Sequence, residues 1–451
     1  MKNSKYAKKM EYPSKLLTIT LLSFTFITLI LIISINIIYS PYDKITTYTI
    51  GNGENIKIGI LSDSHLNPEK SKEKLANYTD HLLKSFESLK KNNVTVIIFA
   101  GDITYKGKKE SYKEFKRIFD FIFPENKPIL NIIMGNHDYN SFPYLPKLLQ
   151  KRFSDILNEK PFSHKIINGF HFINWSSMDG TTVTCNINLN WIKNQIEIAL
   201  KEDSSKPIFV TTHLNPKGTI YGSEKYGNSI IYQLLKSYPN IISISGNSHY
   251  SIIDERNIWQ GDFTAIATQS ISYIRINDHL KNNNYNELKY FFGNYMGYIC
   301  DVNNSIVKFK RINLEKNLFY GENWFIEVPI KKEFFKYKIY ERILSSIAPV
   351  FRENSKIEIF KNNSNNFYYI KFNQALHKNF VHSYRIVLKK GNIKKYEFIF
   401  FSDFYLMPDE RKSEITFKLP KIRKGNYNIF IFARESFGKE SFPLKDSVNF
   451  E

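Results

Sequence analysis

Hydrophobic residues in the first two thirds of the chain follow two alternating patterns. Short runs rich in Ile and Val predict buried strands, and longer stretches with apolar residues every three or four positions predict amphipathic helices. The predicted strands are 57–61, 94–100, 129–134, 171–175, 208–212 and 241–245. The predicted helices are 73–89, 111–123, 144–153, 189–200 and 229–237. This alternation predicts a layered α/β domain.

The pattern changes after about residue 262. Residues 296–301 and 306–312 predict a hairpin that closes the first domain, and 324–331 are expected to lead out of it. Beyond them, one helix is expected within 334–348. Short strands separated by turn-rich segments then predict an all-β sandwich. These strands are 356–360, 367–372, 383–388, 396–401, 414–419 and 426–433. The stretch 424–438 resembles the end of an immunoglobulin or fibronectin-like module.

The N-terminal segment has the pattern of a membrane anchor. Residues 16–35 carry no charge, and at about 1.5 Å per residue they span roughly 30 Å, the hydrocarbon thickness of a bilayer. Five lysines and one Glu precede them, which predicts a cytoplasmic tail at 1–15, a transmembrane signal anchor at 16–39 and an extracytoplasmic remainder. A cleaved signal peptide is the alternative, but residues 35–41 offer no small-x-small cleavage site.

Length and charge refine this picture. A chain of 451 residues favours two folded domains, which we place at 45–330 and 331–451. The net charge of +20 permits nucleic-acid binding, but the lysines are spread along the chain, so a solvated surface is the simpler interpretation. Cys185 and Cys300 are too few for a disulfide framework.

Polar side chains of metal-ligand type follow five of the predicted strands. They are Asp63 and His65 after the first, Gly101-Asp102 after the second, Gly135-Asn136-His137-Asp138 after the third, His213 after the fifth and Gly246-Asn247-Ser248-His249 after the sixth. Since ligands of open α/β sheets bind beyond the carboxyl ends of strands, these motifs are expected to converge on one crevice. A turn, a helix cap or a core histidine explains each motif alone. Their occurrence together favours a functional site.

In this order the motifs resemble the calcineurin-like metallophosphoesterase superfamily, whose pattern is D-x-H, G-D, G-N-H-D or G-N-H-E, an isolated His, and G-H-x-H. The match covers about residues 58–250, and 135–138 are its most specific part. The resemblance implies a layered β-sandwich flanked by helices. It also implies a metal-dependent phosphoric ester hydrolase.

The resemblance further implies two divalent metal ions bound at the strand ends. The first is expected on Asp63, His65, Asp102 and His249. The second is expected on Asp102, Asn136 and His213, with Asn247 in the place of a further ligand. Mixed imidazole and carboxylate ligands suit Mn, Fe, Zn or Co, and Mg is also a candidate for the second site. Asp102 would bridge the two ions.

The implied reaction is attack of a metal-bridging hydroxide on a phosphate mono- or diester. His137 is expected to stabilise the developing charge and to protonate the leaving oxygen, and Asp138 is expected to orient the His137 imidazole. Asn136 completes the catalytic group. The motifs narrow the reaction type but not the substrate.

One position departs from the family pattern. Asn247 stands where the first His of G-H-x-H is expected, and an Asn oxygen is a poorer ligand for Zn or Fe than imidazole. The second site is therefore expected to be weaker or shifted toward Mn or Mg. The alternative is an impaired phosphoesterase fold that serves as a surface binding or adhesion protein. Retention of the four ligands expected on the first metal, and of His137, favours the enzyme.

Overall fold

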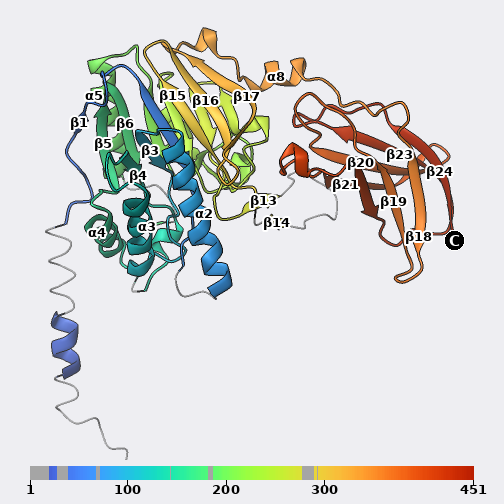
Figure 1. The fold of residues 1–451 in the computed structure, drawn as a ribbon, viewed down its shortest axis with the longest axis horizontal. Helices are drawn as coiled ribbons and strands as arrows, with labels where there is room; N and C mark the ends of the chain where they lie inside the picture. Colours follow the sequence, from blue (N-terminus) through green and yellow to red (C-terminus); the bar gives the residue numbers. More distant parts are fainter. Residues whose placement is uncertain are drawn as a thin grey trace, which may run out of the picture.

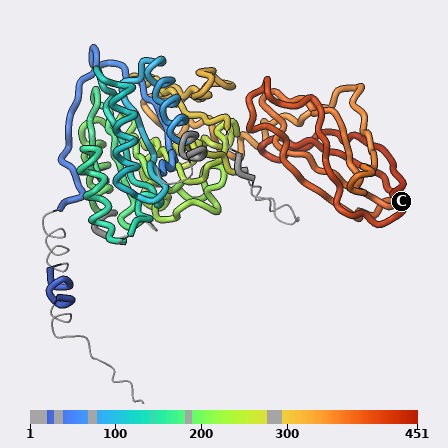
Figure 2. The backbone as a smooth tube through the Cα atoms, turned by 60° about the horizontal axis from the view of Figure 1, so that its bottom comes forward, coloured from blue at the N-terminus to red at the C-terminus, as the bar shows by residue number. Residues whose placement is uncertain are grey.

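The computed structural model describes residues 20–27, 39–67, 72–142, 144–180, 186–276, 289–291 and 293–451. They form a large α/β domain and a smaller all-β domain beside it (Figure 1). Figure 2 shows the C-terminal strands grouped in a separate lobe.

Two β-sheets form the centre of the large domain. The first has the order β17-β16-β15-β2-β3-β4, and the second has the order β1-β5-β6-β7-β10-β12-β11. The strands of the first are β2 (Ile56–Leu61), β3 (Val96–Phe99), β4 (Ile129–Ile132), β15 (Met296–Val302), β16 (Ile306–Asn313) and β17 (Leu318–Glu327). Those of the second are β1 (Thr46–Tyr48), β5 (Phe162–Ile167), β6 (Phe170–Trp175), β7 (Ile208–Thr212), β10 (Ile241–Ser245), β11 (Ile258–Gln260) and β12 (Thr264–Ala267).

The strands that precede the polar motifs run parallel to their neighbours. Strand β3 pairs in parallel with β2 and with β4, and β10 pairs in parallel with β7. Each set therefore ends at one edge of its sheet, which brings the motifs of that sheet together.

The two sheets pack face to face with helices outside. Ile58, Ile98 and Phe209 belong to the apolar cluster between the sheets. On the outer face of the first sheet lie α2 (Lys72–Lys91), α3 (Lys109–Ile122) and α4 (Pro146–Leu157), whose apolar residues share a cluster with Phe99. On the outer face of the second lie α5 (Asn186–Glu202) and α7 (Ser229–Leu235), which cluster with Val210. This is the predicted β-sandwich flanked by helices.

Short elements connect these layers. They are η1 (His137–Tyr139), β8 (Asn215–Pro216), α6 (Ser223–Tyr226), β9 (Gly227–Asn228), η2 (Glu255–Asn257), β13 (Ile274–Ile276) and β14 (Lys289–Phe291). The predicted hairpin is confirmed, because β15 and β16 pair antiparallel. The expectation that 324–331 lead out of the domain is wrong for 324–327, because these residues belong to β17, which extends the sheet by pairing with β16.

The C-terminal domain is all-β, as predicted. After η3 (Lys332–Phe334) and α8 (Ile339–Ser345), β18 (Ile357–Asn362), β19 (Phe367–Asn373) and β22 (Glu414–Lys418) form one sheet. The second sheet contains β20 (Ser383–Lys390), β21 (Ile393–Phe401), β23 (Gly425–Arg434) and β24 (Leu444–Phe450), with η4 (Pro408–Glu410) in a connection. Phe372, Ile386 and Ile429 belong to the apolar core of the two sheets.

The predicted N-terminal tail at 1–15 lies outside the described residues, and so does most of the predicted anchor at 16–39. Residues 20–27 of that anchor are described and are helical. Among the helices within the described ranges, none is long and apolar enough to cross a membrane. The anchor stays a prediction.

Candidate metal centre

The structure brings the predicted ligands from both sheets to one place. Asp63 and His65 follow β2, Asp102 follows β3 and Asn136 follows β4. His213 follows β7 of the other sheet, and Asn247 and His249 follow β10. The centre therefore lies where the carboxyl ends of the two parallel strand sets meet.

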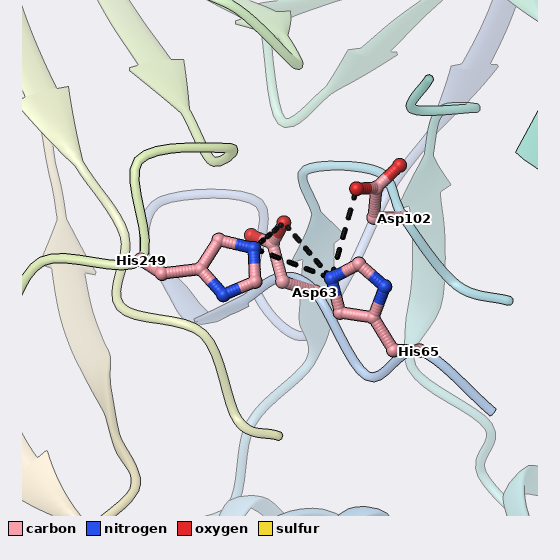
Figure 3. A group of neighbouring side chains, drawn as sticks. All are labelled: Asp63, His65, Asp102 and His249. Atoms are coloured by element: carbon pink, nitrogen blue, oxygen red, sulfur yellow. Dashed lines mark hydrogen bonds and ion pairs between the residues drawn. The ribbon is translucent and has the colours of Figure 1, made fainter. Parts of the chain in front are cut away.

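Four of these side chains form a compact buried cluster. Asp63, His65, Asp102 and His249 each offer a ligating atom, and these atoms all lie within 4.8 Å of one another. The Nε2 atom of His249 lies 3.2 Å from Asp63 Oδ1 and 3.2 Å from His65 Nε2 (Figure 3). Two carboxylates and two imidazoles thus face a common point.

A second group shares Asp102 with the first. The Nε2 atom of His213 lies 3.2 Å from Asp102 Oδ2 and 3.1 Å from Asn136 Oδ1. The same Asp102 oxygen lies 3.7 Å from His65 Nε2. Asp102 is therefore the side chain common to the two groups.

The rings of His213 and His249 each contact a backbone carbonyl on the side away from the centre. These contacts decide which ring nitrogen faces the centre. The Nδ1 atom of His213 lies 2.8 Å from the Ala100 carbonyl oxygen, and Nδ1 of His249 lies 3.3 Å from that of Tyr273. A carbonyl only accepts, so each Nδ1 carries a proton and Nε2 is the nitrogen that faces the centre. When Nε2 holds no proton, it presents a lone pair there. Backbone carbonyls at this position are typical partners of metal-binding histidines.

The donor set fits a divalent cation. Lone pairs that face carboxylate oxygens repel one another unless a cation or a proton lies between them. The Oδ1 atom of Asp63 is buried and has no hydrogen-bond partner within the described part of the chain. A bound cation would satisfy this oxygen together with the Nε2 atom of His249, which lies 3.2 Å from it.

Without a cation, the side chains of the centre shift the pKa values of Asp63, His65 and His213. Burial would raise the pKa of Asp63, but His249 outweighs burial and lowers that pKa below its ordinary value. Burial lowers the pKa of His65 to about 3, so this ring is neutral. Burial also opposes protonation of His213, yet the Asp102 carboxylate outweighs it and raises the pKa of His213 to about 10. A cation on His213 Nε2 would have to displace that proton.

The backbone around the centre is strained. Five of the predicted residues are non-glycine residues in the left-handed region: Asp63, His65, Asp102, Asn247 and His249, with φ of 57°, 47°, 49°, 65° and 60°. Such conformations are costly and cluster at functional sites. Gly135 permits the close approach of two loops, because an added Cβ would lie 2.2 Å from Asp102 Oδ1.

His137 lies beside the cluster and is half-buried. Its ring is 4.6 Å from that of His65, measured between centroids, and its peptide N–H donates to Asp102 Oδ1 at 2.8 Å. Its Nδ1 atom lies 3.2 Å from the Tyr105 carbonyl oxygen. This leaves the Nε2 atom of His137 as the ring position for proton exchange.

Asp138 does not orient the His137 ring, so that prediction is wrong. The Asp138 carboxylate is buried and accepts hydrogen bonds from the peptide N–H groups of Ile103, Thr104 and Gly135 and from the Thr104 hydroxyl. It therefore ties the loop after β3 to the loop after β4. The Tyr105 carbonyl is the group that contacts the imidazole.

Asn247 lies next to the cluster. Its peptide N–H donates to Asp63 Oδ2 at 3.3 Å, and its Nδ2 atom donates to the Tyr226 carbonyl oxygen at 3.3 Å. One end of the amide is therefore used in a protein contact.

Sequence reasoning missed Tyr273. Its ring lies 4.4 Å from that of His249 and 5.8 Å from that of His65, and its carbonyl faces His249 Nδ1. The signal was available, because the polar run 268–270 follows the buried strand β12, as the other motifs follow theirs. Ser270 of this run donates a hydrogen bond to the Asp63 carbonyl.

Residues 56–251 match the family model for calcineurin-like phosphoesterases. The large α/β domain holds this matched segment and is called the phosphoesterase domain for that reason. The matched segment includes all the predicted ligands, and it ends directly after the last of them. The match to phosphoesterases thus agrees with the buried cluster of Asp and His side chains.

Solved structures similar to this chain share little sequence identity with it. A purple acid phosphatase from yellow lupin seeds is 11% identical over 60% of this chain and 54% of its own, with a TM-score of 0.41. A predicted phosphoesterase from Streptococcus pneumoniae is 11% identical over 60% of this chain and 98% of its own, with a TM-score of 0.27. The alignment thus spans about half of the lupin enzyme. No curated protein matches the chain.

Proposed function

We propose that this chain is a metal-dependent phosphoesterase that hydrolyses a phosphate mono- or diester. The observation that carries the proposal is the shared carboxylate of Asp102, whose Oδ2 atom faces His65 on one side and His213 on the other. A carboxylate shared by two sets of ligands would hold two cations close together, which suits two-metal hydrolysis.

The residues present would hold two cations. Asp63, His65, Asp102 and His249 would bind the first, and Asp102, Asn136 and His213 would bind the second. When bound, divalent cations would supply the positive charge that activates water and stabilises the phosphoryl oxygens. Asn247 is the weakest candidate ligand, because its amide nitrogen is engaged with Tyr226.

His137 would move the proton. With Nδ1–H donated to the Tyr105 carbonyl, Nε2 of a protonated ring can donate to the leaving oxygen of the ester. Since His137 is half-buried, a substrate can reach its ring.

We also propose that residues 16–39 anchor the protein in the cell membrane as a single span with the N-terminus in the cytoplasm. The support is the uncharged run at 16–35 behind five lysines. The phosphoesterase domain would then act outside the cytoplasm on a phosphate ester.

The test is hydrolysis of bis-p-nitrophenyl phosphate and p-nitrophenyl phosphate by the full chain in detergent. Protein stripped with a chelator is reloaded separately with Mn, Zn, Mg or Fe. The Asp102→Ala variant serves as the inactive form, and Asp301→Asn, at a surface ion pair with Lys310, serves as the matched control.

Turnover that needs added metal, is lost in Asp102→Ala and survives in Asp301→Asn would support the phosphoesterase. The preferred ester would separate a diesterase from a monoesterase. Absence of turnover with every metal, together with less than one bound ion per chain, would refute the enzyme and favour the binding-protein alternative.

A further inference from the structure

His382 belongs to the C-terminal domain but is buried against the phosphoesterase domain. The residue is 3% exposed, and its ring packs on Phe404 of its own domain, with 5.0 Å between centroids. Its Nε2 atom lies 3.0 Å from Nη2 of Arg256 in the phosphoesterase domain. A guanidinium only donates, so Nε2 of His382 is the acceptor. This hydrogen bond joins the two domains.

Arg256 is held in place on its other sides. It makes a paired contact with the buried Asp254 carboxylate, with Nε to Oδ1 at 2.9 Å and Nη2 to Oδ2 at 2.7 Å. Its guanidinium carbon lies 3.7 Å from the ring centroid of Tyr221, and the Tyr221 peptide N–H donates to the Arg256 carbonyl at 3.0 Å. Paired contacts to a carboxylate and stacking on a ring fix the plane of a guanidinium.

Tyr221 connects Arg256 to the metal centre. Its ring stacks on Tyr250 with 4.6 Å between centroids, and Tyr250 directly follows His249. The Tyr250 ring is 1% exposed and packs closely on Gly222, where an added Cβ would lie 1.9 Å from Tyr250 Cε2. The ring of Tyr250 is therefore enclosed from two sides by the segment 221–222.

The segment 247–250 needs such support. Asn247 and His249 both have left-handed backbones, which revert to ordinary conformations unless their surroundings hold them. Tyr226 also helps, since its carbonyl accepts from Asn247 Nδ2 and its ring lies 6.2 Å from that of Tyr250. In the stack of His382, Arg256, Tyr221 and Tyr250, His382 is the member that comes from the C-terminal domain.

We propose that His382 is a positioning residue for the metal centre. Through Arg256 and Tyr221 it fixes Tyr250, and thereby the place of the His249 imidazole. The C-terminal domain is then a structural component of the centre as well as a neighbouring module. This inference rests on the proposed metal site.

The test measures Mn²⁺ binding by equilibrium dialysis of the full chain in detergent, with hydrolysis of bis-p-nitrophenyl phosphate as a second readout. His382→Phe keeps a ring against Phe404 and removes the acceptor for Arg256. His382→Gln returns an acceptor near the position of Nε2. His377→Phe is the matched control, since His377 lies in the same domain and its ring contacts the Ile347 carbonyl.

We expect His382→Phe to raise the Mn²⁺ dissociation constant about tenfold, the lower end of the effect of groups that support metal ligands. His382→Gln is expected to recover most of this loss, and His377→Phe is expected to bind like the wild type. Equal Mn²⁺ binding by His382→Phe and the wild type would overturn the proposal. If His382→Phe does not fold, Tyr221→Leu interrupts the same chain of contacts, and wild-type Mn²⁺ binding by that variant would overturn the proposal equally.

The outcomes separate this inference from the proposed function. A wild-type protein that binds Mn²⁺ without turnover would refute hydrolysis and leave the positioning effect measurable by dialysis. A wild-type protein that binds no Mn²⁺ would overturn both.

Discussion

The Nδ1 atom of His137 lies 3.2 Å from the carbonyl oxygen of Tyr105. This contact fixes the ring so that Nε2 remains for the substrate, which is the geometry of a general acid. A group that donates a proton to the leaving oxygen matters most when that oxygen is a poor leaving group.

We therefore expect His137→Gln to lower kcat about 10²–10⁴-fold for phenyl phosphate esters, the usual contribution of general acid catalysis. The loss should be smaller for p-nitrophenyl esters, because p-nitrophenolate leaves without full protonation. Mn²⁺ content should be unchanged. Steady-state kinetics over a series of substituted phenyl esters checks this, and an equal loss for all leaving groups would argue against the acid.

Asp138 offers the contrasting case. Its carboxylate accepts from three peptide N–H groups and the Thr104 hydroxyl, so Asp138→Asn replaces one acceptor oxygen by a donor that faces donors. We expect a loss of stability of about 2–4 kcal/mol, as for a buried network that is broken on one side. Chemical denaturation measures this loss. If Asp138→Asn is instead as stable as the wild type and its kcat depends differently on the leaving group, Asp138 takes part in catalysis.

The contrast shows which parts of the site the sequence could predict. Each predicted ligand follows a buried strand. An apolar run followed by a polar motif therefore predicts the strand, and it also predicts that the motifs converge at the carboxyl ends of the strands. The conformation of the loops decides whether the Asp138 carboxylate contacts the His137 ring or backbone N–H groups. No local sequence pattern distinguishes these two cases. His382 carries no signal at all, because its partner Arg256 lies more than a hundred positions away in the sequence.

The fold shows the same division. Central strands such as β3 are apolar on both faces and were predicted, because parallel strands buried on both sides form continuous hydrophobic runs. Strands β17 and β24 lie at sheet edges and were missed. Their exposed positions, such as Glu322 and Asp446, interrupt the apolar pattern and make each strand look like a loop.

The position of Asn247 beside the cluster leads us to expect that Asn247→His and the wild type differ in metal content. Because the Asn247 amide donates to the Tyr226 carbonyl, it adds little to the second cation, whereas an imidazole would add a nitrogen ligand. We expect Asn247→His to bind Zn²⁺ at the second site about tenfold more tightly than the wild type does. Elemental analysis after dialysis against graded Zn²⁺ measures this. Asn52→His, in an exposed turn, is the control.

Unchanged zinc content in Asn247→His would mean that position 247 does not reach the second cation. In that case the second site would depend on Asp102, Asn136 and His213 alone.

A buried histidine pair away from the metal centre predicts the acid stability of the large domain. His164 Nδ1 donates to Gln195 Oε1 at 2.9 Å, and His164 Nε2 accepts from His171 Nδ1 at 2.8 Å. This chain of hydrogen bonds needs a neutral His164 ring, because His164 Nε2 can accept only when it carries no proton. Burial is the main cause that lowers the pKa of each ring from 6.5 to about 4.

The sign of the pH effect follows from these shifts. Between pH 6.5 and 4 the unfolded chain binds protons at both positions and the folded chain does not, so the free energy of unfolding falls as the pH falls through this window. His171→Asn keeps a donor for His164 and removes one titrating group. We expect it to reduce the pH-dependent loss by about 2 kcal/mol, which corresponds to a shift of roughly one to two pKa units. Urea unfolding at pH 7 and pH 4.5, with a chelator present to exclude metal effects, measures both proteins. Parallel losses in the wild type and His171→Asn would show that other buried groups, such as His65, account for the acid sensitivity.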